Sequence, residues 1–331
     1  MAAESSTTYC VIPSFRAAAT IVEVVADALR YVDVVVVVDD GCPERSGAVA
    51  RAAYDSNAAV VVIDREHNGG VGAAMKTGIA YALDAGADLI VKIDADGQMD
   101  ASFIPLMAAL FEDDPALVAV KGNRFFQAQV LEAMPKARLF GNAVLSLMAK
   151  FASGYWNTID PTNGFVAFRA PLLALLPWRD FADSYFFEMS VLCELGLRRL
   201  PLVELEMPTI YTAAPSSLSI GRVILDFPPK LFKLTLRRLL LQYFVFDVNI
   251  GSLYAVVGSL LLLFSVVFGG YEWIESYVTN VGRATGTVML VVLTFLMGFQ
   301  LLLNALMCDM QFSRGTRHEL LVNVRAKHRA P

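Results

Sequence analysis

Two aspartates one residue apart, Asp94 and Asp96, have the residue type and spacing to bind a metal ion in this chain of 331 residues. They end an apolar run and are followed directly by Gly97 and Gln98. Carboxylate oxygens are the hard ligands that Mg²⁺ and Mn²⁺ prefer, and Mg²⁺ is commonly shared between one or two carboxylates and phosphate groups. We therefore expect a Mg²⁺- or Mn²⁺-bound diphosphate here, with the two aspartates as metal ligands and with contacts from Asp94, Ala95, Asp96 and Gln98.

Another acidic residue, Asp40, follows the run of valines at residues 34–38. A carboxylate at the end of a buried strand can accept a hydrogen bond from the base or the ribose of a nucleotide. Alternatively, an aspartate here could cap a helix that begins near Pro43, because aspartate is a preferred N-cap residue. In both interpretations Asp40 lies where the strand ends.

A glycine-rich turn begins at Asn68 and contains Gly69, Gly70 and Gly72. Glycines allow the backbone to approach a ligand closely, and the helix that we expect after the turn offers N–H groups to phosphate. The G-x-G-x-x-G dinucleotide fingerprint fits poorly, because it belongs after the first strand and Met75 occupies the place of its last glycine.

The elements that must position these residues are short apolar runs that alternate with longer, alanine-rich segments. Runs of β-branched residues without polar alternation are typical of strands that are buried on both faces. The segments between them are long enough for crossover helices, so we expect a mostly parallel sheet covered by helices, with ligands at the carboxyl ends of the strands. The runs lie at residues 9–13, 34–38, 59–64, 88–94 and 117–122, a further strand-like stretch lies at 197–211, and the clearest helical segments lie at 17–31, 71–85, 135–153 and 184–195.

Composition limits the class of protein. Hydrophobic residues make up 56% of the chain, and their excess is concentrated after about residue 230. The formal net charge of −5 gives no reason to expect a nucleic-acid partner. The four cysteines are scattered without a Cys-x-x-Cys pair, so no zinc site is indicated. The first ten residues resemble no secretory signal, so we expect the N-terminal part to stay in the cytoplasm.

Two stretches without Asp, Glu, Lys or Arg lie near the C-terminus, about 24 residues after Asp247 and about 25 residues after Arg283. Each is long enough to cross the roughly 30 Å apolar core of a bilayer as a helix. Buried helices of a globular protein are the alternative, but the short loop between the stretches favours a transmembrane hairpin. Lysines and arginines flank its two ends, and the positive-inside rule then predicts an integral protein of the cell membrane (the inner membrane of a bacterium) with a cytoplasmic head.

A basic segment precedes the first stretch. Pro228 and Pro229 suit the first turn of a helix, so we expect a helix to begin there. This helix either binds anionic headgroups or phosphate at the membrane interface or simply anchors the chain. Its cationic side chains fall on one face, namely Lys230, Lys233, Arg237 and Arg238.

Taken together, these motifs resemble those of the family-2 glycosyltransferases of the GT-A fold, specifically the polyprenyl- and dolichyl-phosphate sugar transferases. Ser14-Phe15-Arg16 departs from the Tyr-Asn that the family usually has, and the Gln-x-x-Arg-Trp motif of processive polysaccharide synthases is absent, which favours transfer of a single sugar. The resemblance covers residues 11 to about 211 and is carried, besides the segments above, by Val11-Ile12-Pro13, Gly122-Asn123-Arg124, Arg138, and Asp160 with Gly164-Phe165.

The resemblance implies an α/β, GT-A catalytic domain with a Rossmann-like, mostly parallel sheet at residues 1–215. Amphipathic interfacial helices at 216–247, a transmembrane hairpin at 248–310 and a basic cytoplasmic tail at 311–331, which we expect to be disordered, would follow; a homo-oligomer is a possible assembly. A UDP- or GDP-linked sugar would be the donor. Its nucleotide would contact Pro13, Phe15, Asp40, Asn68, Gly69, Gly72 and the 94–98 motif, and its sugar Asp160 and Gly164.

The acceptor implied by the resemblance is a polyprenyl phosphate, such as undecaprenyl or dolichyl phosphate. A phosphate monoester has a second pKa of about 6, so its oxygen attacks the sugar without a strong base. Direct displacement would invert the anomeric carbon. The acceptor phosphate would be held by Arg124, Arg138, Lys230 and Lys233, although the two arginines could instead form structural ion pairs.

Asp96, Arg124, Arg138 and Glu188 are the expected catalytic residues. Glu188 would orient Arg138 or a sugar hydroxyl, or it would be an ordinary acid on a helix surface. In the alternative function, direct transfer to a glycerolipid or another hydroxyl acceptor, Glu188 or Asp183 would have to act as a base.

Overall fold

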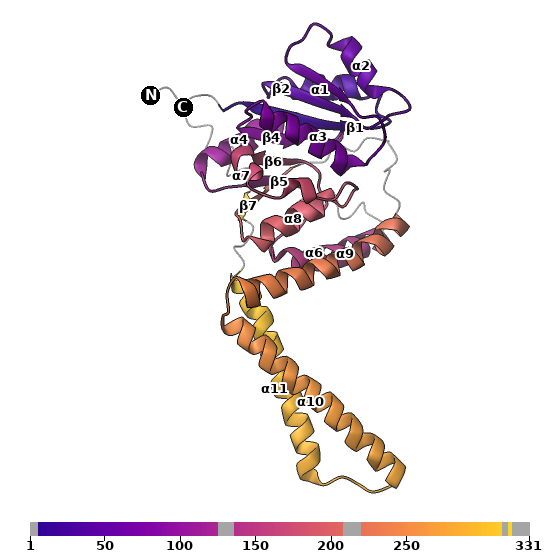
Figure 1. The fold of residues 1–331 in the computed structure, drawn as a ribbon, viewed down its shortest axis with the longest axis vertical. Helices are drawn as coiled ribbons and strands as arrows, with labels where there is room; N and C mark the ends of the chain where they lie inside the picture. The colour runs from indigo at the N-terminus through magenta and orange to yellow at the C-terminus, as the bar shows by residue number, and fades with distance from the viewer. Residues whose placement is uncertain (1–5, 125–135, 208–219, 313–316, 320–331) are drawn as a thin grey trace. The chain divides into compact units, whose positions relative to one another are not determined.

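The structure, a computed structural model, describes residues 6–124, 136–207, 220–312 and 317–319 (Figure 1). The chain forms two compact units. The first contains residues 1–232 together with 315–331, and the second contains residues 233–314. We call them the head and the hairpin unit.

The head is built on a mostly parallel sheet, as the sequence predicts. In the described residues the strand order is β3-β2-β1-β4-β6-β5-β7-β8. Only β6 runs antiparallel to its neighbours, β4 and β5, and the other pairs are parallel. The strands are β1 (Thr8–Ser14), β2 (Val34–Asp39), β3 (Val60–Asp64), β4 (Leu89–Lys92), β5 (Ala119–Asn123), β6 (Val166–Arg169), β7 (Leu202–Glu206) and β8 (Arg317–Glu319).

Helices cover both faces of the sheet (Figure 1). Alternate residues of one strand enter different cores: Cys10 and Ile12 pack on one face, and Tyr9 and Val11 on the other. This confirms the prediction that the β-branched runs are buried on both sides. The first core is closed by α1 (Ile21–Ala28), α2 (Ser46–Ala53) and α4 (Ile104–Asp113), and the second by α3 (Val71–Asp84), α7 (Ala170–Ala174) and α8 (Phe187–Leu197).

Two strands of the head were not expected from the sequence. β6 is a run of only four residues, and its antiparallel course between β4 and β5 carries the segment 160–164 to the carboxyl end of β4. β8 lies in the tail that we expected to be disordered, and this expectation is wrong for residues 317–319. They pair in parallel with β7, whose edge offers unpaired backbone groups, so the chain after the hairpin unit returns to the head.

The helix α9 (Ile220–Leu240) begins eight residues before Pro228, so the predicted helix start at Pro228 and Pro229 is wrong. A proline inside a helix removes a hydrogen bond and crowds the preceding turn. Packing offsets this strain, because Phe227 and Leu231, on either side of the prolines, are buried. The Phe227 ring meets the Phe186 ring edge-on, with 5.0 Å between their centroids.

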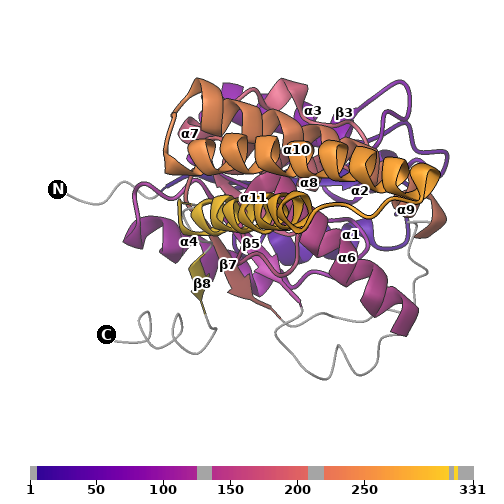
Figure 2. The same cartoon turned by 90° about the horizontal axis from the view of Figure 1, so that it is seen from below.

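Two long apolar helices, α10 (Ile250–Thr279) and α11 (Thr285–Phe312), form most of the hairpin unit and lie side by side (Figures 1 and 2). Both are long and apolar enough to cross a membrane. Small residues allow α10 and α11 to approach each other closely. A Cβ added to Gly298 of α11 would lie 2.8 Å from the backbone nitrogen of Leu262 in α10. The Ser265 hydroxyl donates to the Val291 carbonyl across the pair at 2.8 Å. The two helices fit the predicted transmembrane hairpin.

Arg238 does not belong to an exposed basic face, contrary to the sequence prediction. Its guanidinium is buried and forms a two-pronged ion pair with Asp309 of α11, at 2.7 and 2.9 Å. The Tyr243 hydroxyl donates to the same carboxylate at 2.7 Å. Arg238 therefore joins α9 to α11, whereas Lys233 remains exposed.

We predict that Arg238→Met destabilises the hairpin unit by about 3–5 kcal/mol, because it leaves the Asp309 carboxylate buried without its counter-charge. The double variant Arg238→Met/Asp309→Leu should recover most of that loss. Thermal unfolding of the full chain in detergent would measure both, with Lys233→Met as the exposed control. A double variant that is no more stable than Arg238→Met would contradict the prediction.

Candidate active site

The acidic residues singled out in the sequence gather at one edge of the sheet. β1 pairs in parallel with both β2 and β4, so the carboxyl ends of these three strands are neighbours. Asp40 follows β2, and Asp94 and Asp96 follow β4. Pro13 lies in β1 opposite Val38 of β2.

Asp40 is buried and is held by the glycine-rich turn. Its carboxylate accepts the backbone N–H groups of Gly69 at 3.0 Å and Gly70 at 2.7 Å, and it pairs with the guanidinium of Arg65. The Asn68 side chain accepts the Gly70 N–H at 3.0 Å as well. The N–H groups of Gly69 and Gly70 thus serve to fix Asp40, and Asp40 does not cap the helix near Pro43.

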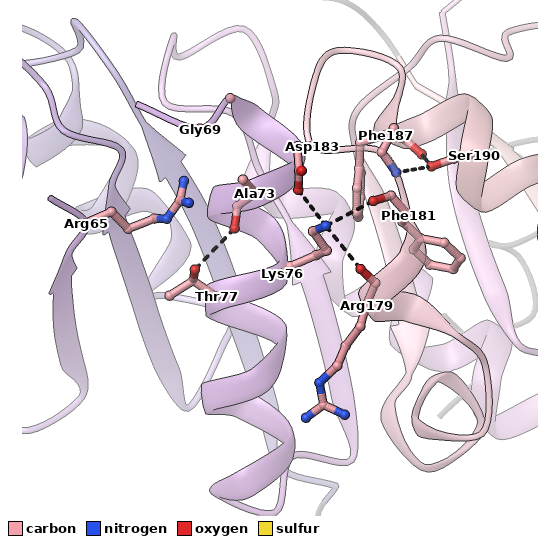
Figure 3. Close-up of polar contacts among 12 residues, drawn as sticks. Arg65, Gly69, Ala73, Lys76, Thr77, Arg179, Phe181, Asp183, Phe187 and Ser190 are labelled. Atoms are coloured by element: carbon pink, nitrogen blue, oxygen red, sulfur yellow. Dashed lines mark hydrogen bonds and ion pairs between the residues drawn. The ribbon is translucent and has the colours of Figure 1, made fainter. Parts of the chain in front are cut away.

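The start of α3 is bound to the segment that precedes α8 (Figure 3). The Ala73 N–H donates to the Asp183 carbonyl at 3.0 Å, so this N–H is not open to a phosphate, unlike the sequence expectation. A Cβ on Gly72 would overlap the Ala182 carbonyl oxygen, which explains the glycine. Lys76 donates to the carbonyls of Arg179 and Phe181, each at 3.1 Å, and pairs with the Asp183 carboxylate at 2.5 Å.

A buried lysine that the sequence interpretation missed, Lys92, links three predicted site residues. Its ammonium group pairs with Asp94, lies 3.0 Å from the carboxylate of Glu188, and donates to the Gly164 carbonyl at 3.3 Å. Burial alone would lower the pKa of Lys92, but the charges of Asp94 and Glu188 raise it above its ordinary value. These two ion pairs favour the protonated form of Lys92.

Asp96 is the more exposed of the two aspartates, and its carboxylate accepts the backbone N–H of Gln98 at 3.0 Å. Partial desolvation raises the pKa of Asp96, and the negative charge of Asp94 adds to the shift. Among the described residues, no group of three or more His, Cys, Asp and Glu side chains could hold a metal. An ion here would thus have two protein carboxylates and would take its other ligands from diphosphate and water. This set fits Mg²⁺ or Mn²⁺.

Arg124 and Asp160, predicted for different roles, form a bidentate ion pair at the end of β5. The two bonds measure 2.8 and 3.0 Å, and the Asp160 carboxylate also accepts the Arg124 backbone N–H at 3.2 Å. Asp160 is fully buried, whereas the Arg124 side chain is 36% exposed. Burial alone would raise the pKa of Asp160, but the charge and hydrogen bonds of Arg124 lower it.

A second buried lysine, Lys121, supports this pair by donating to the Asp160 carbonyl. Burial lowers its pKa to about 8, against the opposing charges of Asp160 and Glu204. Both missed lysines leave a signal in the sequence, because each interrupts an apolar strand run just before a predicted site residue.

The remaining predicted residues lie on separate segments of the chain. Ala95 is buried, and its carbonyl accepts the Thr20 hydroxyl at 2.5 Å, while Phe15 is 41% exposed. The Lys230 ammonium lies 5.5 Å from the ring centroid of Phe186, which precedes α8. Arg138 lies in α6 (Lys136–Ser153), and its side chain is outside what the structure describes.

Several proteins of known activity are similar in sequence to part of this chain. The curated relatives include the UDP-N-acetylglucosamine–dolichyl-phosphate N-acetylglucosaminyltransferase of Methanococcus voltae, 28% identical over 62% of this chain and 86% of that protein. The undecaprenyl-phosphate mannosyltransferase of Micrococcus luteus is 33% identical over 44% of this chain and 58% of that protein. The polyprenol monophosphomannose synthase of Mycolicibacterium smegmatis is 30% identical over 42% and 52%, respectively.

These relatives transfer sugars to prenyl phosphates, as their names state. The model of the family described as glycosyl transferase family 2 matches residues 9–175, which contain the sheet edge with Asp40, Asp94, Asp96 and the Arg124–Asp160 pair. With its mostly parallel, helix-covered sheet and its acidic residues at the strand ends, the chain belongs to glycosyl transferase family 2.

Proposed function

We propose that this protein transfers one sugar, with inversion, from a UDP- or GDP-linked donor to a polyprenyl phosphate at the cytoplasmic face of the cell membrane. The observation that carries the proposal is the Arg124–Asp160 pair. It holds a guanidinium, partly exposed and fixed in orientation by a buried carboxylate, at the sheet edge that carries Asp94 and Asp96. A guanidinium fork suits a phosphate group.

The donor side of the site is acidic. Asp94 and Asp96 would hold a Mg²⁺ or Mn²⁺ ion, which would supply Lewis-acid stabilisation of the diphosphate. Asp40 lies at the end of β2, on the other side of β1 from β4, where it would contact the nucleoside. Asp160 and Gly164 lie on the segment between α6 and β6, and Gly164 approaches Asp94 so closely that an added Cβ would be 2.7 Å from its carboxylate. This proximity supports the placement of the donor sugar beside Gly164.

On the acceptor side, a phosphate oxygen attacks the anomeric carbon while the bond from that carbon to the diphosphate breaks. The bonding electrons leave with the nucleoside diphosphate, and no proton has to be removed from the acceptor. Arg124 orients the acceptor phosphate, with Arg138, Lys230 and Lys233 as further cationic contacts. Catalysis comes from aligning the attacking phosphate oxygen with the departing diphosphate oxygen across the anomeric carbon, and from stabilising the nucleoside diphosphate as it leaves.

The polyprenyl chain requires an apolar environment, which the two long apolar helices and an exposed apolar stripe on α6 would provide. α10 and α11 are each long enough to span a bilayer, and β8, which follows them, pairs with β7 of the head. Two crossings would return the chain to its starting side, and the basic flanks support the cytoplasm as that side. In α6, Phe140, Val144 and Leu147 form an exposed apolar stripe that would face lipid.

The proposal is tested by transfer from labelled UDP- and GDP-sugars to undecaprenyl or dolichyl phosphate, with and without Mg²⁺ or Mn²⁺. We expect label in a lipid-phosphate product with one class of donor and only when metal is present. Donor hydrolysis without a lipid product would contradict the acceptor assignment.

Asp96→Ala should abolish transfer, because the donor diphosphate loses one of the two carboxylates that would hold its metal. We expect a fall in kcat/KM of at least about 100-fold, the scale of removing one electrostatic catalytic group. Asp84→Ala, which removes an exposed acid at the end of α3, is the control. Turnover of Asp96→Ala like that of wild type would exclude the metal assignment.

Arg124→Lys keeps the charge but loses the guanidinium fork. We predict that the KM for polyprenyl phosphate rises about 10-fold or more, the scale of one charge-assisted hydrogen bond, with little change in the donor KM. Arg51→Lys, at an exposed ion pair with Asp64, is the matched control. An unchanged acceptor KM, or a larger effect on the donor, would show that Arg124 is only a structural partner of Asp160.

A further inference from the structure

The two buried lysines of the site occupy equivalent places in the sheet. Val166 of β6 pairs with Lys92 of β4 on one side and with Lys121 of β5 on the other. Ile90 and Ala119, two residues before each lysine, pack in the core that α8 closes, so both lysines point to the α8 face. Lys92 is 1% exposed and Lys121 is 4% exposed.

Their contacts divide the site into two halves. Lys92 binds Asp94 and Glu188, and a Cβ added to Gly164 would lie 2.5 Å from its ammonium nitrogen, so the cation is enclosed. Lys121 donates to the carbonyl of Asp160, whose carboxylate holds Arg124. One lysine supports the donor carboxylates, and the other supports the arginine on the acceptor side.

Glu188 lies in the first turn of α8 with only 11% of its side chain exposed, 3.0 Å from the Lys92 ammonium. To take a proton from an acceptor hydroxyl, Glu188 would have to give up its charge in this pair. The buried Lys92 ammonium would then lose one of its two ion pairs and keep only Asp94, which is also proposed to bind the metal ion, and the loss of a buried ion pair is unfavourable. An ionised phosphate acceptor has no proton to lose, so Glu188 can keep its charge and its ion pair with Lys92.

We propose that Lys92 is a positioning residue of the transfer reaction, which holds Asp94 in place for the donor and balances the charge of Glu188, so that Glu188 is not the base. This inference rests on the proposed function. In this inference Glu188 has a structural and electrostatic role: its ion pair with Lys92 joins α8 to the end of β4.

The test is a double-mutant cycle of Lys92→Met and Glu188→Gln, with two readouts: the Kd for the nucleotide-sugar, measured without acceptor, and kcat/KM for transfer. Lys92→Met leaves two adjacent carboxylates without their cation, so we expect the donor Kd to rise about 10-fold or more. Glu188→Gln alone should retain transfer within about 10-fold of wild type. The double variant removes one charge of each sign, and it should bind donor at least about fivefold more tightly than Lys92→Met.

Lys121→Met is the matched control, because it removes a similarly buried lysine from β5, on the other side of β6. Adding Glu188→Gln to it should not restore donor binding. If Glu188→Gln alone lowers transfer by about 1,000-fold or more with donor binding intact, the scale expected of a lost base, the inference is overturned. Equal rescue of both lysine variants, or no rescue of Lys92→Met, would overturn it as well.

Thermal unfolding of each variant separates loss of fold from loss of function, and Glu188→Gln decides the role of Glu188 even if Lys92→Met fails to fold. Donor binding does not depend on which acceptor is used. Failure of wild type to make a lipid-phosphate product would therefore contradict the proposed function and leave the result of the cycle readable.

Discussion

An ammonium group in the interior of a protein must be surrounded by opposite charge, and Lys92 places such a group at the end of β4. Its partners are Asp94, two residues further along the chain, and Glu188, which comes from α8. The ion pair with Glu188 therefore joins the end of β4 to the first turn of α8. The contacts of Lys92 thus hold Asp94, the carboxylate proposed to serve the donor, beside the helix that closes the second core of the head.

A second set of contacts fixes α8 at the same, N-terminal end. The segment before α8 is bound to α3 by the Ala73 N–H and by Lys76, and Gly72 permits the close approach (Figure 3). The glycine-rich turn that begins α3 also supplies the N–H groups that hold Asp40. One turn of backbone therefore connects the residue proposed to contact the nucleoside with the helix that carries Glu188.

The sequence was most informative where local physical rules dominate. Valine runs without polar alternation predicted the parallel strands correctly, and the strand ends led to Asp40, Asp94 and Asp96. β6 escaped prediction because four residues between a turn and a helix carry little pattern, and β8 because its pairing with β7 depends on a distant part of the chain. Pro228 marked a helix start by local preference, but tertiary packing of its neighbours overrode that preference.

Long-range charge pairing was the other limit of sequence interpretation. Arg238 has the spacing of an exposed basic face, and only the structure shows that Asp309, far along the chain, neutralises it. The same holds for Lys92 and Glu188. The predicted roles of Arg124 and Asp160 were assigned separately, whereas the structure presents them as one unit. The location of Asp40, Asp94 and Asp96 at strand ends was therefore predictable from the sequence, whereas the ion-pair partner of each charged side chain was not.

In the proposed reaction the acceptor oxygen is already ionised when it binds, so the site needs no free base. The most direct test offers the wild-type protein, its donor and its metal an equal mixture of a polyprenyl phosphate and the polyprenol of the same chain length, with products identified by mass spectrometry. We predict that the sugar appears on the phosphate alone. Sugar attached to the polyprenol hydroxyl would contradict the account, because that reaction requires removal of a proton that the Lys92-bound Glu188 is not placed to accept.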